Sequence, residues 1–145
     1  GSATYANRYV QTARKALEQK KQRPLKQAEK FGGGNGYLGC ANTALVYHAK
    51  RLMALYEVDK PYAMSLPHLE TIGQLTYDDR LTHAMTAHPK VCPLTGELVF
   101  FSYELLAPKV HYAVADKTGK LLRSFEVQTK SGKPVMMHDM AITKN

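Results

Sequence analysis

Histidine is the residue type in this sequence best suited to chemistry, and two of the six histidines stand in suggestive surroundings. His88 ends an apolar run directly before Pro89, and His138 lies beside Asp139 in another apolar stretch. Neutral imidazole is a common ligand of transition metals, so a metal site is the chemistry to consider. No HExxH or CxxC spacing organises the histidines, so spacing alone supports such a site only weakly. The remaining four, which we expect to be surface or packing residues, are His48, His68, His83 and His111.

The elements that must position these histidines are predicted to be short β-strands. From residue 42 onward, eight or nine apolar runs rich in Val, Tyr, Phe and Leu are bounded by turn residues, which is typical of an all-β protein. The predicted strands cover residues 43–48, 51–57, 61–66, 69–73, 82–88, 98–103, 110–115 and 121–127, with a further β-like stretch at 134–138. Gly119 can supply the positive φ of the last hairpin turn. Repeated hairpins favour a sandwich, a barrel or the blades of a propeller.

The N-terminal part differs from the rest in charge. Residues 1–30 hold eight Lys or Arg against Glu18 and Glu29, whereas residues 31–145 hold twelve against ten acidic residues. Residues 10–23 predict an amphipathic helix that ends before Pro24, and residues 26–36, with their glycine-dense run, predict a flexible loop. A basic helix can bind an anionic membrane surface or phosphate backbones. We favour a solvated surface helix, because its apolar face lacks large aromatic side chains.

Composition and cysteine usage limit the class of protein. The chain has 145 residues, 44% of them hydrophobic and 22% charged, which excludes collagen-like, coiled-coil and wholly disordered classes. No window approaches the ~18 consecutive apolar residues of a membrane span, and the N-terminus lacks the apolar core of a secretory signal. Cys40 and Cys92 do not form a CxxC motif, so a reducing compartment is expected.

Five sequence blocks occur together in a characteristic order. They are ANTALVYH at 41–48, DKPY at 59–62, TAHPKV at 86–91, LTGE at 94–97 and MMHDMAIT at 136–143. On these blocks the chain resembles the carotenoid cleavage dioxygenase family, and it is most similar to the plant and algal branch. The resemblance runs from about Thr4 to Asn145. Cys92 and Met140 depart from the family pattern, which usually has Asp and Phe there.

The resemblance implies a fold and a metal site. Family members are seven-bladed β-propellers capped by helices and loops, with a non-haem Fe(II) held on the propeller axis by four histidines. His88 and His138 match the first two iron ligands, and the glutamates that hydrogen-bond some ligands cannot be assigned. We therefore expect residues 1–145 to be one fragment of a single propeller domain. Residues 1–36 would form the basic helix and Gly-rich loop, and residues 37–145 about two to three blades.

The resemblance also implies an activity. The family cleaves a C=C bond of a carotenoid or apocarotenoid with O2, giving two carbonyl products without an organic cofactor. The implied partners are that substrate and O2, with no nucleic acid; a peripheral membrane contact through the basic helix is the weaker alternative to the solvated surface helix favoured above. The compartment is the plastid or the cytoplasm. Since the third and fourth histidines of the family lie beyond Asn145, we expect the 145-residue chain on its own to be inactive. The alternative is a non-catalytic, truncated β-module that binds an apolar polyene or a partner subunit.

Three further expectations concern single residues. Asp139 is expected to turn away from His138 and to meet a backbone amide or a Lys, because adjacent strand residues point to opposite faces. His83, five positions before His88, would likewise face the other way in an uninterrupted strand. Met136 and Met137 are expected to fill the core rather than to contact a ligand.

Overall fold

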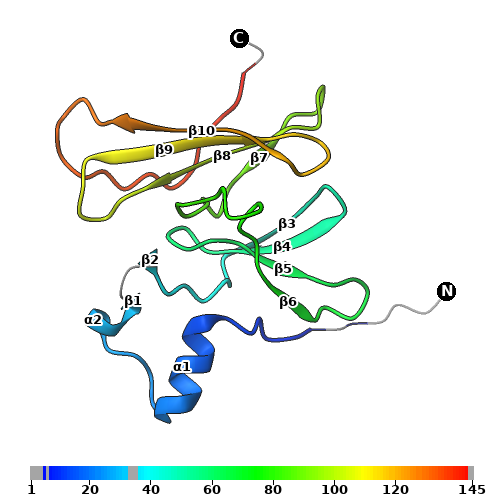
Figure 1. Cartoon of the computed structure of the whole chain (residues 1–145), viewed down its shortest axis with the longest axis vertical. Coiled ribbons are helices and arrows are strands. Elements are labelled where there is room, and N and C mark those ends of the chain that lie inside the picture. Colours follow the sequence, from blue (N-terminus) through cyan, green and yellow to red (C-terminus); the bar gives the residue numbers. More distant parts are fainter. Residues whose placement is uncertain (1–4, 6, 33–35, 144–145) are drawn as a thin grey trace.

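Two four-stranded antiparallel sheets stack on each other, and a short helix lies beyond the first sheet (Figure 1). This computed structural model describes residue 5 and residues 7–32 and 36–143. Each sheet is built from strands that are consecutive in the sequence. The all-β class predicted from the sequence is confirmed.

The first sheet has the order β3-β4-β5-β6. Its strands are β3 (Ala44–His48), β4 (Arg51–Leu55), β5 (Tyr62–Met64) and β6 (Thr71–Gln74). Ala49 and Lys50 join β3 to β4 with φ values of 50° and 61°, the left-handed conformation of a two-residue hairpin turn. The predicted hairpin at this place is therefore confirmed.

The second sheet has the order β10-β9-β8-β7. Its strands are β7 (Lys90–Val91), β8 (Leu98–Tyr103), β9 (Lys109–Ala115) and β10 (Leu121–Gln128). The carboxylate of Asp116 accepts the backbone N–H groups of Thr118 and Lys120 at 2.9 and 3.0 Å, and Gly119 has a φ of +86°. These contacts close the β9–β10 hairpin at the predicted turn.

The main core lies between the two sheets. Strand alternation places Met53 and Leu55 of β4 on one side of it and Leu98 and Phe100 of β8 on the other, all at most 1% exposed. All six residues of β8 are buried, so this central strand is covered on both of its faces. The core holds the two sheets face to face.

The N-terminal part contains more structure than the sequence predicted. Helix α1 (Ala13–Lys21) is capped by Thr12, whose side-chain oxygen accepts the N–H of Lys15 at 3.1 Å. The predicted loop at 26–36 is wrong in part, because it holds three short elements; residues 33–35 of its glycine run lie outside the described residues. These elements are α2 (Gln27–Lys30), β1 (Phe31–Gly32) and β2 (Gly36–Tyr37), and β1 pairs with β2. Among the described helices, none has the length and apolar character needed to cross a bilayer.

Two predicted strands are absent from the structure. Residues 82–88 form no strand because their backbone divides its hydrogen bonds between the β4–β5 loop and the second sheet: Met85 N–H donates to Asp59 O, and Thr86 N–H donates to Phe101 O of β8. Residues 134–138 also form no strand. The expectation that Met136 fills the core is wrong, since it is 81% exposed.

Phe100 tests the sheet-to-sheet core. Phe100→Ala is expected to lower the free energy of unfolding by about 3–5 kcal/mol, because a fully buried ring is lost and a cavity remains. Phe125→Ala is the matched control on the same sheet, where the ring is 49% exposed and the expected loss is about 1 kcal/mol. Chemical denaturation measures both values, and equal losses would contradict this placement of the core.

Candidate metal centre

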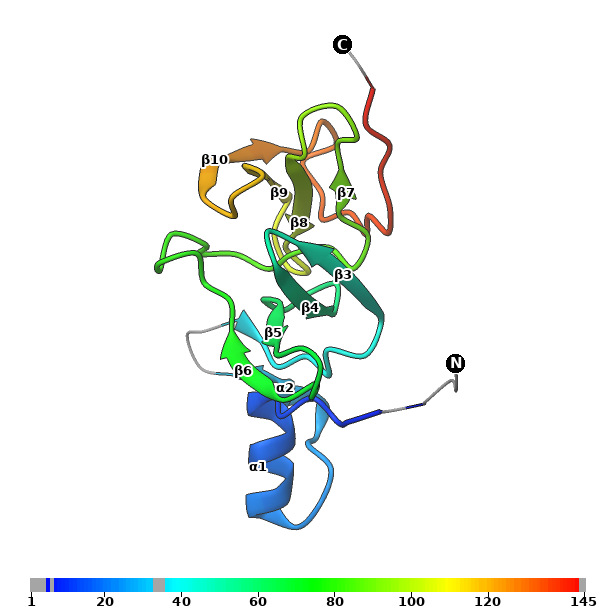
Figure 2. The ribbon, with the colours of Figure 1, turned by 90° about the vertical axis from the view of Figure 1, so that its right-hand side faces the viewer.

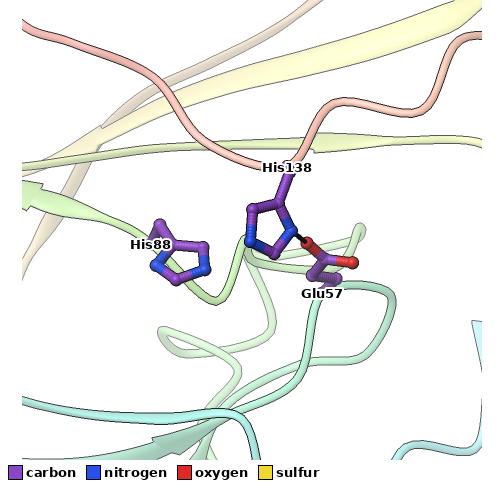
Figure 3. Close-up of side chains that lie close together, drawn as sticks. All are labelled: Glu57, His88 and His138. Atoms are coloured by element: carbon purple, nitrogen blue, oxygen red, sulfur yellow. Dashed lines mark ion pairs between the residues drawn. The ribbon is translucent and has the colours of Figure 1, made fainter.

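Glu57, His88 and His138 come together from three separate segments of the chain (Figure 3). Each offers one ligand atom, and these atoms lie within 4.8 Å of one another. The two imidazole rings are 4.6 Å apart between centroids, with an angle of 59° between their planes. The two sequence-predicted ligands are thus neighbours, and a carboxylate that the sequence did not indicate joins them.

Glu57 lies on the short loop between β4 and β5, and Asp59 anchors this loop. The buried carboxylate of Asp59 accepts the backbone N–H groups of Gly39 at 2.8 Å and Lys60 at 2.7 Å, and the side-chain amide of Gln74 at 2.9 Å. A Cβ at Gly39 would lie 2.7 Å from Cβ of Asp59, so only glycine permits this close approach. The anchor fixes the backbone two residues after Glu57.

The electrostatics of Asp59 reflect its burial. Burial raises the pKa of this carboxyl above its ordinary value, although the hydrogen bonds from Gly39, Lys60 and Gln74 act in the opposite direction. The charged form is therefore disfavoured in the folded state despite its donors.

His88 is positioned by the buried segment that crosses between the sheets. The backbone N–H of His88 donates to the hydroxyl of Thr86 at 3.1 Å, and Thr86 itself is 1% exposed and bonded to Phe101 of β8. Met85 on the same segment belongs to the main core. The backbone of His88 is thus tied to both the core and the second sheet.

Nε2 of His88 is buried and has no hydrogen-bond partner within the part of the chain that the structure describes. Burial of an unpaired polar atom is costly, so such an atom is uncommon where it has no function. An imidazole nitrogen with a free lone pair is a metal ligand. His88 therefore fits the ligand role that its sequence block implies.

His138 contacts Glu57 through its other ring nitrogen. Nδ1 of His138 lies against Oε1 of Glu57, as an ion pair when the ring is protonated. The contact does not meet hydrogen-bond geometry, and this oxygen is buried without a further partner among the described residues. Figure 3 shows Glu57 on the side of His138 away from His88, so the second ring nitrogen of His138 is the one turned toward His88. The side chain of His138 is 73% exposed.

Asp139 binds Lys90, two residues after His88. Its carboxylate lies 2.6 Å from the Lys90 ammonium and also accepts the N–H of Met140 at 2.7 Å. The Lys90 hydrogen bond, with that of Met140, lowers the pKa of Asp139 below its usual range. The expected contact with a Lys is therefore confirmed, although the strand alternation used to predict it is absent here.

The other four histidines have different surroundings. His48 contacts the carbonyl of Gly96 through Nε2 at 2.9 Å, and His68 lies exposed in the β5–β6 loop. His83 contacts two serine hydroxyls, those of Ser102 and Ser124, and stacks on His111 with centroids 4.7 Å apart. Burial lowers the pKa of His83.

A second group of possible ligands contains His111 with Glu104 and Glu126. Here the polar atoms already have partners: His111 contacts Glu104 at 3.1 Å, and Lys109 binds Glu126 at 3.0 Å. Exposed glutamates with ion-pair partners need no metal to explain them. This group therefore differs from the first, where a buried nitrogen has no partner.

Comparisons with known proteins identify the family of the chain. A family model described as retinal pigment epithelial membrane protein matches residues 1–145. The chain is 39% identical, over 99% of its length, to a carotenoid 9,10(9',10')-cleavage dioxygenase of Arabidopsis thaliana, and 38% identical, over its whole length, to the Crocus sativus enzyme of that name. The chain belongs to the carotenoid oxygenase family. It spans 31% of the length of each of these two relatives.

Solved carotenoid oxygenase-type structures show the same fold. The Pseudomonas brassicacearum lignostilbene dioxygenase matches 94% of the chain with a TM-score of 0.81 and 35% identity, and the chain covers 30% of that protein. A cobalt-substituted Synechocystis apocarotenoid oxygenase matches 94% of the chain with a TM-score of 0.72 and 26% identity, with 32% of that protein covered. The predicted partial β-propeller is confirmed, and the two four-stranded sheets are its blades. Cobalt substitution in the Synechocystis protein means that at least one member of this fold holds a metal.

Glu57 is the site residue that sequence reasoning missed. It follows β4 directly, and nothing in its neighbours distinguishes it from the chain's other glutamates. Its role becomes visible only when the C-terminal segment brings His138 against it. A carboxylate beside an imidazole is the kind of group that, by general rule, fixes the tautomer and direction of a metal-binding histidine.

Asp59 gives a pH test of the loop that carries Glu57. Because its folded pKa is raised above the ordinary 3.8, its contribution to stability is full below that pH and is lost as the pH rises through the folded value. The free energy of unfolding of the wild-type chain minus that of Asp59→Asn should therefore decrease as the pH rises from below 3.8.

Asp116 is the matched control for that measurement. The side-chain hydrogen bond from Thr118, with backbone donors, lowers the pKa of Asp116, so its contribution is present above the ordinary pKa and lost as the pH falls. The free energy of unfolding of the wild-type chain minus that of Asp116→Asn should increase as the pH rises. Denaturation curves across this range measure both variants, and slopes of the same sign would contradict the assigned environments.

Proposed function

We propose that this chain supplies two of the iron ligands, His88 and His138, of a dioxygenase that cleaves a C=C bond of a carotenoid or apocarotenoid. The observation that carries the proposal is the buried, unpartnered Nε2 of His88 beside the second imidazole. Family membership and the names of the relatives support the substrate class. The products of such a reaction are two carbonyl compounds, each taking one oxygen atom of O2.

The donor set suits Fe(II). Imidazole nitrogens bind Fe(II) without adding charge, which leaves the metal its full positive charge and positions for other ligands. Bound iron would supply the redox chemistry that activates O2 toward an electron-rich double bond. The remaining histidine ligands implied by the family would come from sequence beyond this chain, which covers about a third of its relatives.

The protein groups described here have distinct tasks at this site. The core and Thr86 fix the backbone from which the His88 side chain extends. The Glu57 carboxylate lies against Nδ1 of His138, and its negative charge disfavours a lone pair on that nitrogen, which favours the tautomer whose other nitrogen is free to bind metal. Asp59 holds the Glu57 loop in place through three hydrogen bonds. None of these tasks requires a carboxylate ligand on the metal.

Peripheral contact with a membrane stays a prediction for α1. Arg14 binds Glu18 and Lys21 binds Glu29, so among the described residues only Lys15 and Lys20 of this helix lack an acidic partner. Fewer free cations mean a weaker attraction to anionic lipid. Two Arabidopsis relatives are named as chloroplastic, and both the plastid and the cytoplasm stay predicted compartments for this chain.

The ligand assignment is tested in the natural protein that carries this chain. His88→Ala and His138→Ala are each expected to lose bound iron and to abolish cleavage, measured by metal analysis and by the disappearance of polyene absorbance with formation of aldehyde. His68→Ala is the control, because that histidine is exposed on a loop between β5 and β6. Turnover retained in either ligand variant would refute the assignment.

The same experiment separates the enzyme from the alternative β-module. A non-catalytic module would bind an apolar polyene or a partner subunit without forming aldehyde, and the ligand variants would bind it as well as the wild type does. Isotopically labelled apocarotenoid distinguishes bound substrate from cleaved product. Polyene binding without cleavage in the iron-loaded wild-type protein would support the module and contradict the enzyme.

A further inference from the structure

The segment that carries His138 is held in an unusual way for a metal-binding residue. After Gly132, whose N–H donates to Thr129 O, residues 133–142 make no backbone hydrogen bond to either sheet within the described structure. Figure 2 shows this C-terminal segment running beside β7 without joining the sheet. Side-chain contacts must therefore fix its position.

Two polar contacts at neighbouring residues provide this fixation. His138 contacts Glu57 on the first sheet's loop, and Asp139 contacts Lys90 on β7 of the second sheet. Lys90 is itself held in the sheet by pairing with Val99 of β8. The C-terminal segment is thus attached to one group from each blade.

The Lys90–Asp139 pair links the two histidine-bearing segments directly. Lys90 follows His88 by two residues, with Pro89 restricting the backbone between them, and Asp139 follows His138 immediately. The ammonium and carboxylate groups are 2.6 Å apart, and Asp139 is held further by the N–H of Met140. The spacing of the two imidazoles therefore depends on this ion pair.

We propose that Lys90 and Asp139 form a positioning ion pair that sets the spacing of His88 and His138 for metal binding. This inference rests on the proposed function, because it assigns a task relative to the metal. The pair is partly exposed, with side chains 32% and 50% accessible, so it contributes little to overall stability. Its effect is on the position of His138, and Lys90 and Asp139 are positioning residues that do not themselves bind the metal.

The test measures Co(II) binding to the metal-free natural protein, by titration and by the visible absorption spectrum of the bound ion. Lys90→Met and Asp139→Asn are each expected to weaken Co(II) affinity by about tenfold and to change the spectrum, as losses of outer contacts at metal sites do. The double variant should be no worse than either single variant, because both remove one interaction. Lys90→Arg should retain the wild-type affinity and spectrum.

Lys109→Met is the matched control. Lys109 and Glu126 form an ion pair of 3.0 Å with similar exposure on the same sheet, but they adjoin neither His88 nor His138. This variant should keep both affinity and spectrum. If a single variant does not fold, the charge-swapped Lys90→Asp/Asp139→Lys protein provides a second test. It should recover most of the wild-type Co(II) affinity.

The outcomes separate this inference from the proposed function. Unchanged Co(II) affinity and spectrum in Lys90→Met, together with lost binding in His88→Ala, would overturn the positioning role and leave the ligand assignment intact. No stoichiometric Co(II) binding by the wild-type protein, or binding that His88→Ala does not affect, would overturn both. A tenfold loss shared by Lys109→Met would show a general effect of charge removal and would also overturn the positioning role.

Discussion

The packing of the two sheets against each other is the constraint on which the rest of this structure depends. Met53 and Leu55 from β4 meet Leu98 and Phe100 from β8, and burial of these side chains brings two otherwise independent hairpin units together. The end of β4 then lies near the segment that leads into β7. Because Glu57 follows β4 and His88 precedes β7, the hydrophobic core determines that these two polar residues meet.

Each blade also exposes apolar side chains on a face that the described residues do not cover. Leu45, Tyr47 and Ile72 are exposed on the first sheet, and Phe125 and Val127 are half-exposed on the second. A propeller blade packs on a neighbour at each of its faces, so this distribution is expected for two adjacent blades of a larger propeller. It agrees with the coverage of about a third of the related structures.

The sequence predicts the hairpins well because each rests on local signals. Ala49-Lys50 and the turn containing Gly119 stand between runs of alternating residues, and both hairpins form as expected. Residues 82–88 have a similar apolar run but do not form a strand. Such a run indicates that the segment is buried, but it does not indicate which backbone groups form hydrogen bonds with each other. The N–H groups of this segment donate to the β4–β5 loop and to β8, and no local sequence pattern specifies these long-range partners. Glu57 escaped prediction for the same reason, because its partner lies far away in the sequence.

The two histidines of the candidate centre are held by different kinds of interaction. The backbone of His88 is positioned by the core, through Thr86 and its bond to β8, so a change that preserves the core is expected to preserve this backbone position. His138 has no such support and depends on polar contacts from Glu57 and from the residue that follows it. The interaction energy of an exposed ion pair is small because water screens the two charges. The same pair interacts more strongly where less water surrounds it. The two histidines are therefore positioned differently: packing and backbone hydrogen bonds position His88, whereas Glu57 and Lys90 are the polar partners of the segment that carries His138.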